Sequence, residues 1–224
     1  YLDWRSRRVF TIDPPSSRDL DDALSIEHAE GEWYNVTVYV ADVTRFVKEG
    51  DETDLEARKR ATSVYLLDTV DHMLDPSLSQ NLCSILPSVT RFSVAVEFWM
   101  IVKGEVRNDT VHFTRCIIRS CCRLDYDTVQ EVIMGNEDIP ENKRRVSDGF
   151  EWKDIVDDLK ILNQMTQALR KARYENGSIE LSNQELYFDL DEDGYPVRVS
   201  KAVHNESHQL IEEYALLEIG RAHV

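Results

Sequence analysis

The sequence predicts an α+β protein in which a mixed, largely antiparallel sheet is flanked by helices. Short apolar runs recur along the chain, and residues 92–103 alternate between apolar and polar side chains, which is typical of a half-buried strand. Residues 151–174 instead carry their apolar side chains on one stripe, as an amphipathic helix does. Turn residues at 29–32 and 102–105, with a glycine in each, join successive strands and favour antiparallel hairpins.

The individual elements can be placed in order along the chain. The expected strands are at residues 8–12, 22–28, 33–41, 92–103, 105–122, 179–188 and 197–203. The expected helices are at residues 51–63, 125–134 and 151–174. Asp51 or Thr53 can cap the first helix, and Leu55 and Ala57 belong to its expected apolar face. The polar residues 191–194 are expected to form the turn between the last two strands.

Four aspartates lie within ten residues near the start of the chain: Asp13, Asp19, Asp21 and Asp22. Carboxylates packed this densely raise one another's pKa unless a cation lies between them. Apolar runs on both sides anchor the segment to a core, and two prolines at 14–15 force a rigid loop. A rigid array of oxygen atoms suits Mg²⁺, with Mn²⁺ as an alternative. The competing interpretation is a solvated acidic surface, because the chain carries 42 Asp and Glu among 224 residues.

The segment TIDPPSSRDLDDA at residues 11–23 resembles the signature of the RNase II (RNB) family of 3′–5′ exoribonucleases. That signature has an Asp, a second Asp six residues later, and a closing Asp-x-Asp-Asp group, which here are Asp13, Asp19, Asp21 and Asp22. Further segments resemble later blocks of the family, in the same order, at residues 38–43, 60–66, 73–84, 177–181 and 207–213. The resemblance is stronger to the eukaryotic relatives of the exosome's catalytic subunit than to the bacterial enzymes, and it favours the free-standing cytoplasmic branch.

The resemblance implies metal-dependent, processive hydrolysis of single-stranded RNA from the 3′ end, releasing nucleoside 5′-monophosphates. It implies that Asp13 and Asp22 hold one ion, while Asp19 and Asp21 hold or orient a second, with Asp21 closest to the attacking water. Tyr65 matches an aromatic residue that stacks on the 3′ nucleotide; the alternative is a core tyrosine. Two other functions stay open: a catalytically inactive RNA-binding protein on the same fold, and a structural domain stabilised by a metal. Association with an exosome is also left open.

The resemblance suggests that residues 1–217 are the N-terminal part of an RNB catalytic domain. The family's later block of paired arginines, after a Thr-Ser-Pro-Ile run, has no match here. Residues 218–224 are expected to be a non-native tail, because codons that can encode them spell a widely used sequencing adapter. A start at Tyr1 also favours a fragment.

Charge and cysteine content set further expectations. A net charge of −16 is unusual for an RNA-binding surface, so RNA would either enter a narrow channel or contact basic residues elsewhere. The four cysteines, at 83, 116, 121 and 122, lack the spacing of metal ligands. They are expected to be reduced and buried, with Cys121 and Cys122 on opposite faces of a strand, which fits the cytoplasm, or alternatively the nucleus. No apolar run reaches the 18 residues of a membrane span.

Overall fold

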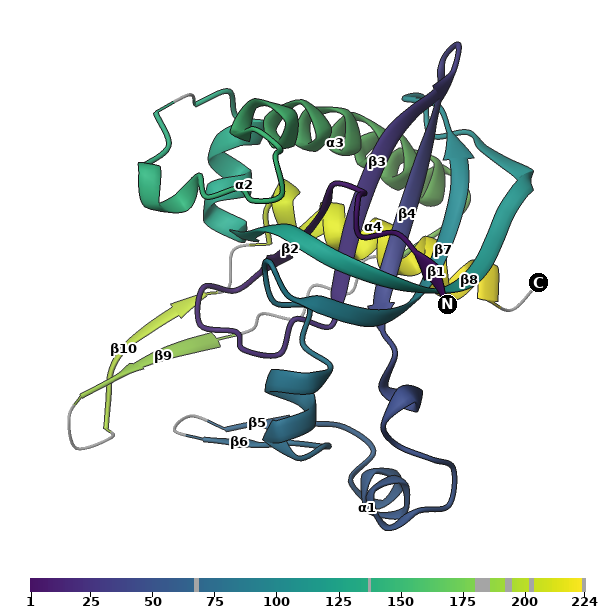
Figure 1. Cartoon of the computed structure of the whole chain (residues 1–224). Helices are drawn as coiled ribbons and strands as arrows, with labels where there is room; N and C mark the ends of the chain where they lie inside the picture. Colours follow the sequence, from purple (N-terminus) through teal and green to yellow (C-terminus); the bar gives the residue numbers. More distant parts are fainter. Residues whose placement is uncertain (67–68, 137, 180–185, 192–194, 202–203, 223–224) are drawn as a thin grey trace.

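The computed structural model describes residues 1–66, 69–136, 138–179, 186–191, 195–201 and 204–222. Its centre is a six-stranded sheet in the order β1-β8-β2-β3-β4-β7 (Figure 1). These strands are β1 (Leu2–Asp3), β2 (Val9–Asp13), β3 (Asp22–Glu30), β4 (Trp33–Ala41), β7 (Thr90–Met100) and β8 (Val106–Asp125). The long strand β8 pairs antiparallel with β7 and parallel with β1 and β2, so the sheet closes on itself. The predicted mixed, largely antiparallel sheet is confirmed.

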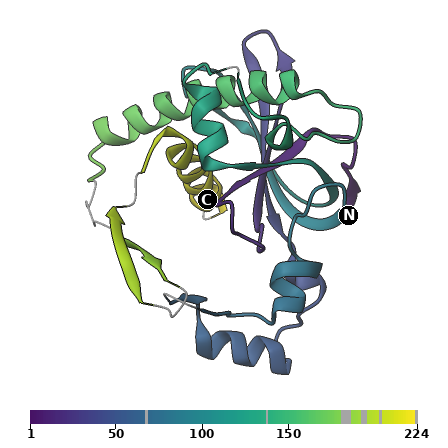
Figure 2. The ribbon, with the colours of Figure 1, turned by 90° about the vertical axis from the view of Figure 1, so that its left-hand side faces the viewer.

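Three helices cover one face of this sheet: α2 (Tyr126–Ile133), α3 (Trp152–Glu175) and α4 (Glu206–Ala222) (Figures 1 and 2). They enclose a core with alternate residues of the strands, such as Phe10 and Leu24. The stripe predicted for the long helix is on the buried side, since Ile155, Leu159 and Leu162 are inaccessible to solvent.

A second apolar cluster lies on the other face of the sheet. Its strand residues, such as Val9, Ala23 and Tyr39, are sequence neighbours of residues in the first core, as the alternation of side chains in a strand requires. Leu20, from the loop between β2 and β3, and Ile85 complete this cluster. The aspartate-bearing loop is therefore anchored by an apolar residue of its own.

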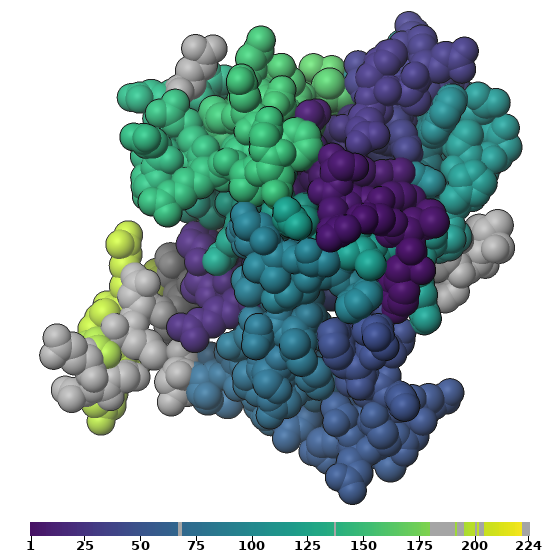
Figure 3. Space-filling view, viewed as in Figure 1, coloured from purple at the N-terminus to yellow at the C-terminus, as the bar shows by residue number. Residues whose placement is uncertain are grey.

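Residues 44–82 form a lobe beside the sheet, seen below the main body in Figures 1 and 3. It contains α1 (Glu52–Arg60), the short strands β5 (Val64–Tyr65) and β6 (Val70–Asp71), and a helical turn at Leu78–Leu82. The predicted helix is confirmed, and Asp51 caps it by accepting a hydrogen bond from the Asp54 amide at 2.8 Å. Its expected apolar face is wrong in part, because Ala57 is buried but Leu55 is 50% exposed. The helix lies in the lobe and not against the main core, so few of its residues need to be apolar.

Strands β9 (Leu186–Leu190) and β10 (Pro196–Lys201) form an antiparallel hairpin. The expected strands at 179–188 and 197–203 are confirmed only where they overlap these bounds. Residues 180–185, 192–194 and 202–203 lie outside the described residues, and with them most of the expected turn at 191–194. Within the described residues, no helix is both long and apolar enough to cross a membrane.

All four cysteines are buried and unpaired, as expected. The expectation that Cys121 and Cys122 lie on opposite faces is wrong, because both side chains belong to the same core cluster. The register of β2 against β8 passes from Ser120 directly to Cys122. Cys121 is thus the extra residue of a β-bulge, which interrupts the strict alternation of the strand.

Candidate active site

The four predicted aspartates lie at the adjoining ends of strands β2 and β3 and in the loop between them. Asp13 is the last residue of β2 and Asp22 is the first of β3. Because β2 and β3 are antiparallel neighbours, these two ends adjoin. The loop of residues 14–21 connects them and carries Asp19 and Asp21. A segment that is compact in sequence is therefore also compact in space.

Arg123 holds the first half of this loop from strand β8. One guanidinium nitrogen donates to three backbone carbonyls, at 3.4 Å to Pro14, 3.0 Å to Pro15 and 2.7 Å to Ser17. The Ser17 amide also closes a turn on the Pro14 carbonyl at 3.1 Å. The loop conformation is therefore fixed by side-chain contacts in addition to its two prolines.

Ser84 and Leu20 hold the second half of the loop. The Ser84 hydroxyl donates to the Arg18 carbonyl at 2.8 Å and accepts from the Leu20 amide at 3.0 Å. The Leu20 carbonyl accepts from the Ile85 amide at 2.8 Å. The backbone on either side of Asp19 is thus bonded to the segment at 84–85. Farther along, the Asp21 carbonyl accepts from the Ala41 amide at 2.8 Å.

The aspartates show the electrostatic signature of crowded carboxylates. Burial, followed by the charge of Asp22, raises the pKa of Asp13 to about 7. Burial and the charge of Asp21 raise the pKa of Asp22 to about 6. The pKa of Asp21 is also raised, by loss of water around the carboxyl and then by the charge of Asp19. These groups repel one another and would be stabilised by protons or by a cation.

Asp13 provides a structural test of whether a cation fits. Its side chain is only 8% exposed, and Oδ2 is buried with no hydrogen-bond partner among the described residues. A buried carboxylate oxygen without a donor is destabilising, and a divalent cation would relieve that. The residues therefore fit a hard cation such as Mg²⁺. Across the described part of the chain, however, no three His, Cys, Asp or Glu side chains are drawn together tightly enough to define a metal centre, so the metal ligands stay a prediction.

Tyr65 extends from the lobe to the aspartate loop. Its hydroxyl donates to Asp19 Oδ2 at 3.3 Å, while 69% of the residue is exposed. Tyr65 is therefore not a core residue, and most of its surface is open to solvent beside the acidic loop. Its contact with RNA stays a prediction.

Tyr126 belongs to the same neighbourhood, although the sequence analysis did not single it out. Burial and the charges of Asp22 and Asp13 raise its pKa to about 12. Its ring stacks on His208 of α4, with centroids 4.0 Å apart and an interplanar angle of 9°. Tyr126 directly follows Asp125, and Asp125 is the register partner of Asp13. That partnership depends on the parallel pairing of β2 with β8, which local sequence does not reveal.

Comparisons with known proteins find similar sequences and a similar fold. The family described as RNB domain matches residues 1–218. Two proteins of Arabidopsis thaliana, named "DIS3-like exonuclease 2" and "Inactive exonuclease DIS3L2", are each 38% identical over 216 residues, which is 96% of this chain and 20% of theirs. The structure of Mycoplasma genitalium RNase R in complex with ribose-methylated single-stranded RNA aligns with a TM-score of 0.84 at 26% identity, over 96% of this chain and 32% of that one.

Proposed function

The chain belongs to the RNB family of exoribonucleases, and we propose that it carries the catalytic aspartates of a processive enzyme degrading single-stranded RNA from the 3′ end. The greater identity to the eukaryotic relatives than to the bacterial RNase R agrees with the branch favoured by the sequence. The chain spans about a fifth of the length of those relatives, so the activity of the whole protein is part of the proposal.

One observation carries the proposal: Asp13, at the end of β2 beside the start of β3, has a buried oxygen that lacks a hydrogen-bond partner among the described residues. Asp13 and Asp22, at the strand ends, would hold one Mg²⁺, and Asp19 and Asp21, in the loop, would hold or orient a second. Bound in this way, the ions supply a water of lowered pKa and neutralise charge at the phosphorus.

Individual residues would position the attacking water, the RNA base and the loop itself. Asp21 keeps contact with solvent although its carboxyl is partly desolvated, so a water can reach this carboxylate and be positioned for attack. Tyr65 offers its ring to the base at the 3′ end, a contact that tolerates any sequence. Arg123 and Ser84 keep the loop in place while RNA advances. The products would be nucleoside 5′-monophosphates.

Single-stranded RNA is the proposed substrate; the complexes of M. genitalium RNase R with single-stranded and with double-stranded RNA support RNA as the class of ligand. A free-standing enzyme in the cytoplasm is proposed over an exosome subunit. The four buried, unpaired thiols are compatible with a reducing compartment.

Identity to the relatives does not separate active from inactive proteins, because one of the two Arabidopsis proteins is named inactive at the same 38%. Asp21→Asn makes the distinction. We expect this change, in a chimaera where this chain replaces the matching segment of the Arabidopsis exonuclease, to lower turnover of 5′-labelled RNA by at least about a hundredfold, about 2.7 kcal/mol. RNA affinity should hold or improve, because one charge that repels phosphate is gone.

Asp109→Asn is the matched control, since Asp109 is an exposed carboxylate paired with Arg107 on β8. It should leave turnover unchanged. Turnover within about threefold of the parent for Asp21→Asn would remove the catalytic assignment. A shared loss of melting temperature and RNA binding would instead support the structural-metal alternative.

A further inference from the structure

A basic pocket adjoins Arg123, the residue that holds the first half of the aspartate loop. It has a volume of about 340 Å³, and its polar lining consists of Arg123, Lys143, Arg145, Asn142, Ser88 and Ser147. No carboxylate lines it, although the chain as a whole has a net charge of −16. A neighbouring hollow shows the contrast, since Asp127, Glu131 and Asp138 line that one.

The walls of this pocket are held in place by hydrogen bonds. Both loops that form it are bonded to the backbone of β8: the Ser88 amide donates to the Ser120 carbonyl at 2.8 Å, and the Ser147 amide to the Cys121 carbonyl at 2.9 Å. The two loops also contact each other, because the Ser88 hydroxyl donates to Ser147 Oγ at 2.9 Å.

The positive charge of the pocket is only partly compensated. Lys143 Nζ lies 3.3 Å from Asp125 Oδ2, which pairs one of the three cations. Arg123 directs its hydrogen bonds to neutral carbonyls. Arg145 is exposed, and no hydrogen bond or ion pair to its side chain is seen within the described residues. The pocket therefore favours an anion.

The donor groups indicate which anion. Guanidinium groups bind the oxygens of phosphate with two parallel hydrogen bonds, and the Lys143 ammonium and the Asn142 amide of the lining can donate to the remaining oxygens. The volume lies in the range of small-molecule sites. We propose that this pocket binds a phosphate group, either of a nucleoside monophosphate or of an RNA strand outside the aspartate site. Because Arg123 lines the pocket and also holds residues 14–17, such a ligand would contact the residue that supports the aspartate loop.

The test measures binding to this chain without metal, by titration calorimetry in EDTA. The probes are inorganic phosphate, 5′-AMP, adenosine and a ten-nucleotide single-stranded RNA. We expect Arg145→Ala to weaken binding of the phosphate-bearing probes by about tenfold, as the loss of one charge-assisted hydrogen bond predicts. Arg144→Ala is the matched control: it removes the same charge one residue away, outside the lining, and should change affinity by less than about twofold.

The probes distinguish the source of the phosphate. If the strand is the ligand, the RNA should bind more tightly than 5′-AMP, and Arg145→Ala should reduce the slope of log affinity against log salt by about 0.7. If the product is the ligand, 5′-AMP should bind at least as tightly as the RNA. The proposal is overturned if adenosine binds as well as 5′-AMP, if no phosphate-bearing probe binds, or if Arg145→Ala and Arg144→Ala have equal effects at unchanged melting temperature. Since no Mg²⁺ is present, failure here leaves the proposed exonuclease activity untouched.

Discussion

The pKa values of the aspartates in this protein depend on the hydrogen-bond donors around each carboxyl group. Burial alone would raise the pKa of Asp125, but hydrogen bonds from Thr128 and Lys143 outweigh it, and the pKa is lowered. Asp13 is buried at the matching position of the neighbouring strand, yet its Oδ2 has no donor among the described residues, and its pKa is raised to about 7. Because Asp125 has donors and Asp13 Oδ2 has none among the described residues, Asp13 is the one of these two carboxylates that is suited to a cation.

Tyr65 allows a prediction about a single contact. In the chimaera, Tyr65→Ala should lengthen the final undigested RNA more than it slows degradation, because stacking on one base contributes about 1–3 kcal/mol. Tyr65→Phe is the control, since it keeps the ring and removes only the hydroxyl bonded to Asp19. Gel analysis of the end products compares the two variants. Equal effects of the two changes would attribute the role of Tyr65 to its hydrogen bond and not to stacking.

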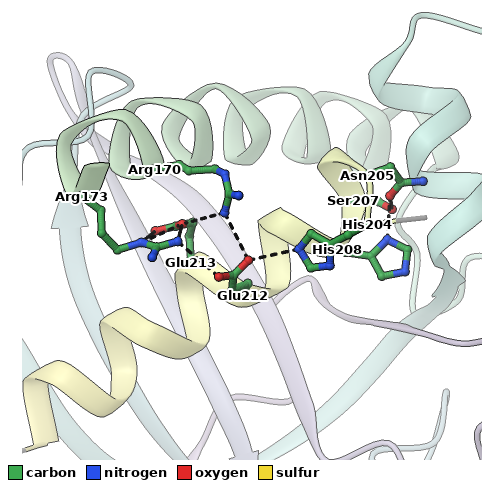
Figure 4. A network of polar contacts seen from close by, with 8 residues as sticks. All are labelled: Arg170, Arg173, His204, Asn205, Ser207, His208, Glu212 and Glu213. Carbon is green, nitrogen blue, oxygen red and sulfur yellow. Dashed lines mark hydrogen bonds and ion pairs between the residues drawn. The ribbon is translucent and has the colours of Figure 1, made fainter. Parts of the chain in front are cut away.

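At the scale of elements, ion pairs join α3 to α4. Figure 4 shows Arg170 and Arg173 of α3 directed at Glu212 and Glu213 of α4. Glu213 is 3% exposed and lies 2.5 Å from Arg173 and 3.6 Å from Arg170. A buried carboxylate depends on such partners, because its desolvation is otherwise uncompensated. These contacts set the position of α4, and with it His208, which stacks on Tyr126 beside the aspartates.

Arg173→Ala tests this connection. We expect the free energy of unfolding to fall by about 1–3 kcal/mol, because Glu213 loses its nearest partner while Arg170 still compensates in part. Lys171→Ala is the control: Lys171 is exposed and, among the described residues, its one ion pair is with Glu175 of its own helix, so its loss should cost less than about 0.5 kcal/mol. Urea titration of both variants makes the comparison. A negligible effect of Arg173→Ala would show that the ion pairs do not stabilise the packing of α3 on α4.

At the scale of the whole molecule, the aspartate cluster should make stability depend on pH. Asp13 and Asp22 have raised pKa values of about 7 and about 6 in the folded protein, against about 3.9 in an unfolded chain. The folded state thus binds more protons than the unfolded state between pH 4 and 7, so stability falls as pH rises through this window. Carboxylates with lowered pKa values, such as Asp125, have their effect at lower pH.

Denaturation of the metal-free protein at pH 5 and at pH 8 measures this effect. Between pH 5 and pH 8, Asp13 should cost the parent protein on the order of 2 kcal/mol of unfolding free energy. We expect this part of the pH dependence to be absent in Asp13→Asn. Asp109→Asn should leave the pH dependence as it is. Adding Mg²⁺ at pH 8 should restore stability to the parent, because a ligand bound only by the folded state stabilises it. A pH profile that is identical in the parent and in Asp13→Asn would contradict the raised pKa of Asp13.

Local sequence patterns were enough to predict the positions of most strands and helices, the buried stripe of α3 and the spacing of Asp13, Asp19, Asp21 and Asp22. These features are local: alternation along a strand and periodicity along a helix report which side chains face the core. The four acids could be singled out because they lie within ten residues and adjoin apolar strands. Their proximity in space then follows from a single short loop between neighbouring strands.

The distant residues that support this loop could not be predicted from local patterns. Arg123 and Ser17 are separated by 106 positions, and Ser84 bonds to the Arg18 carbonyl across 66. The parallel pairing of β2 with β8 places Asp125 and Tyr126 beside Asp13, and a bulge turns Cys121 and Cys122 into the same core. Pairing and register between strands far apart in the chain depend on the packing of both faces of the sheet at once. No periodicity within either strand contains that information, so these contacts could be seen only in the folded molecule.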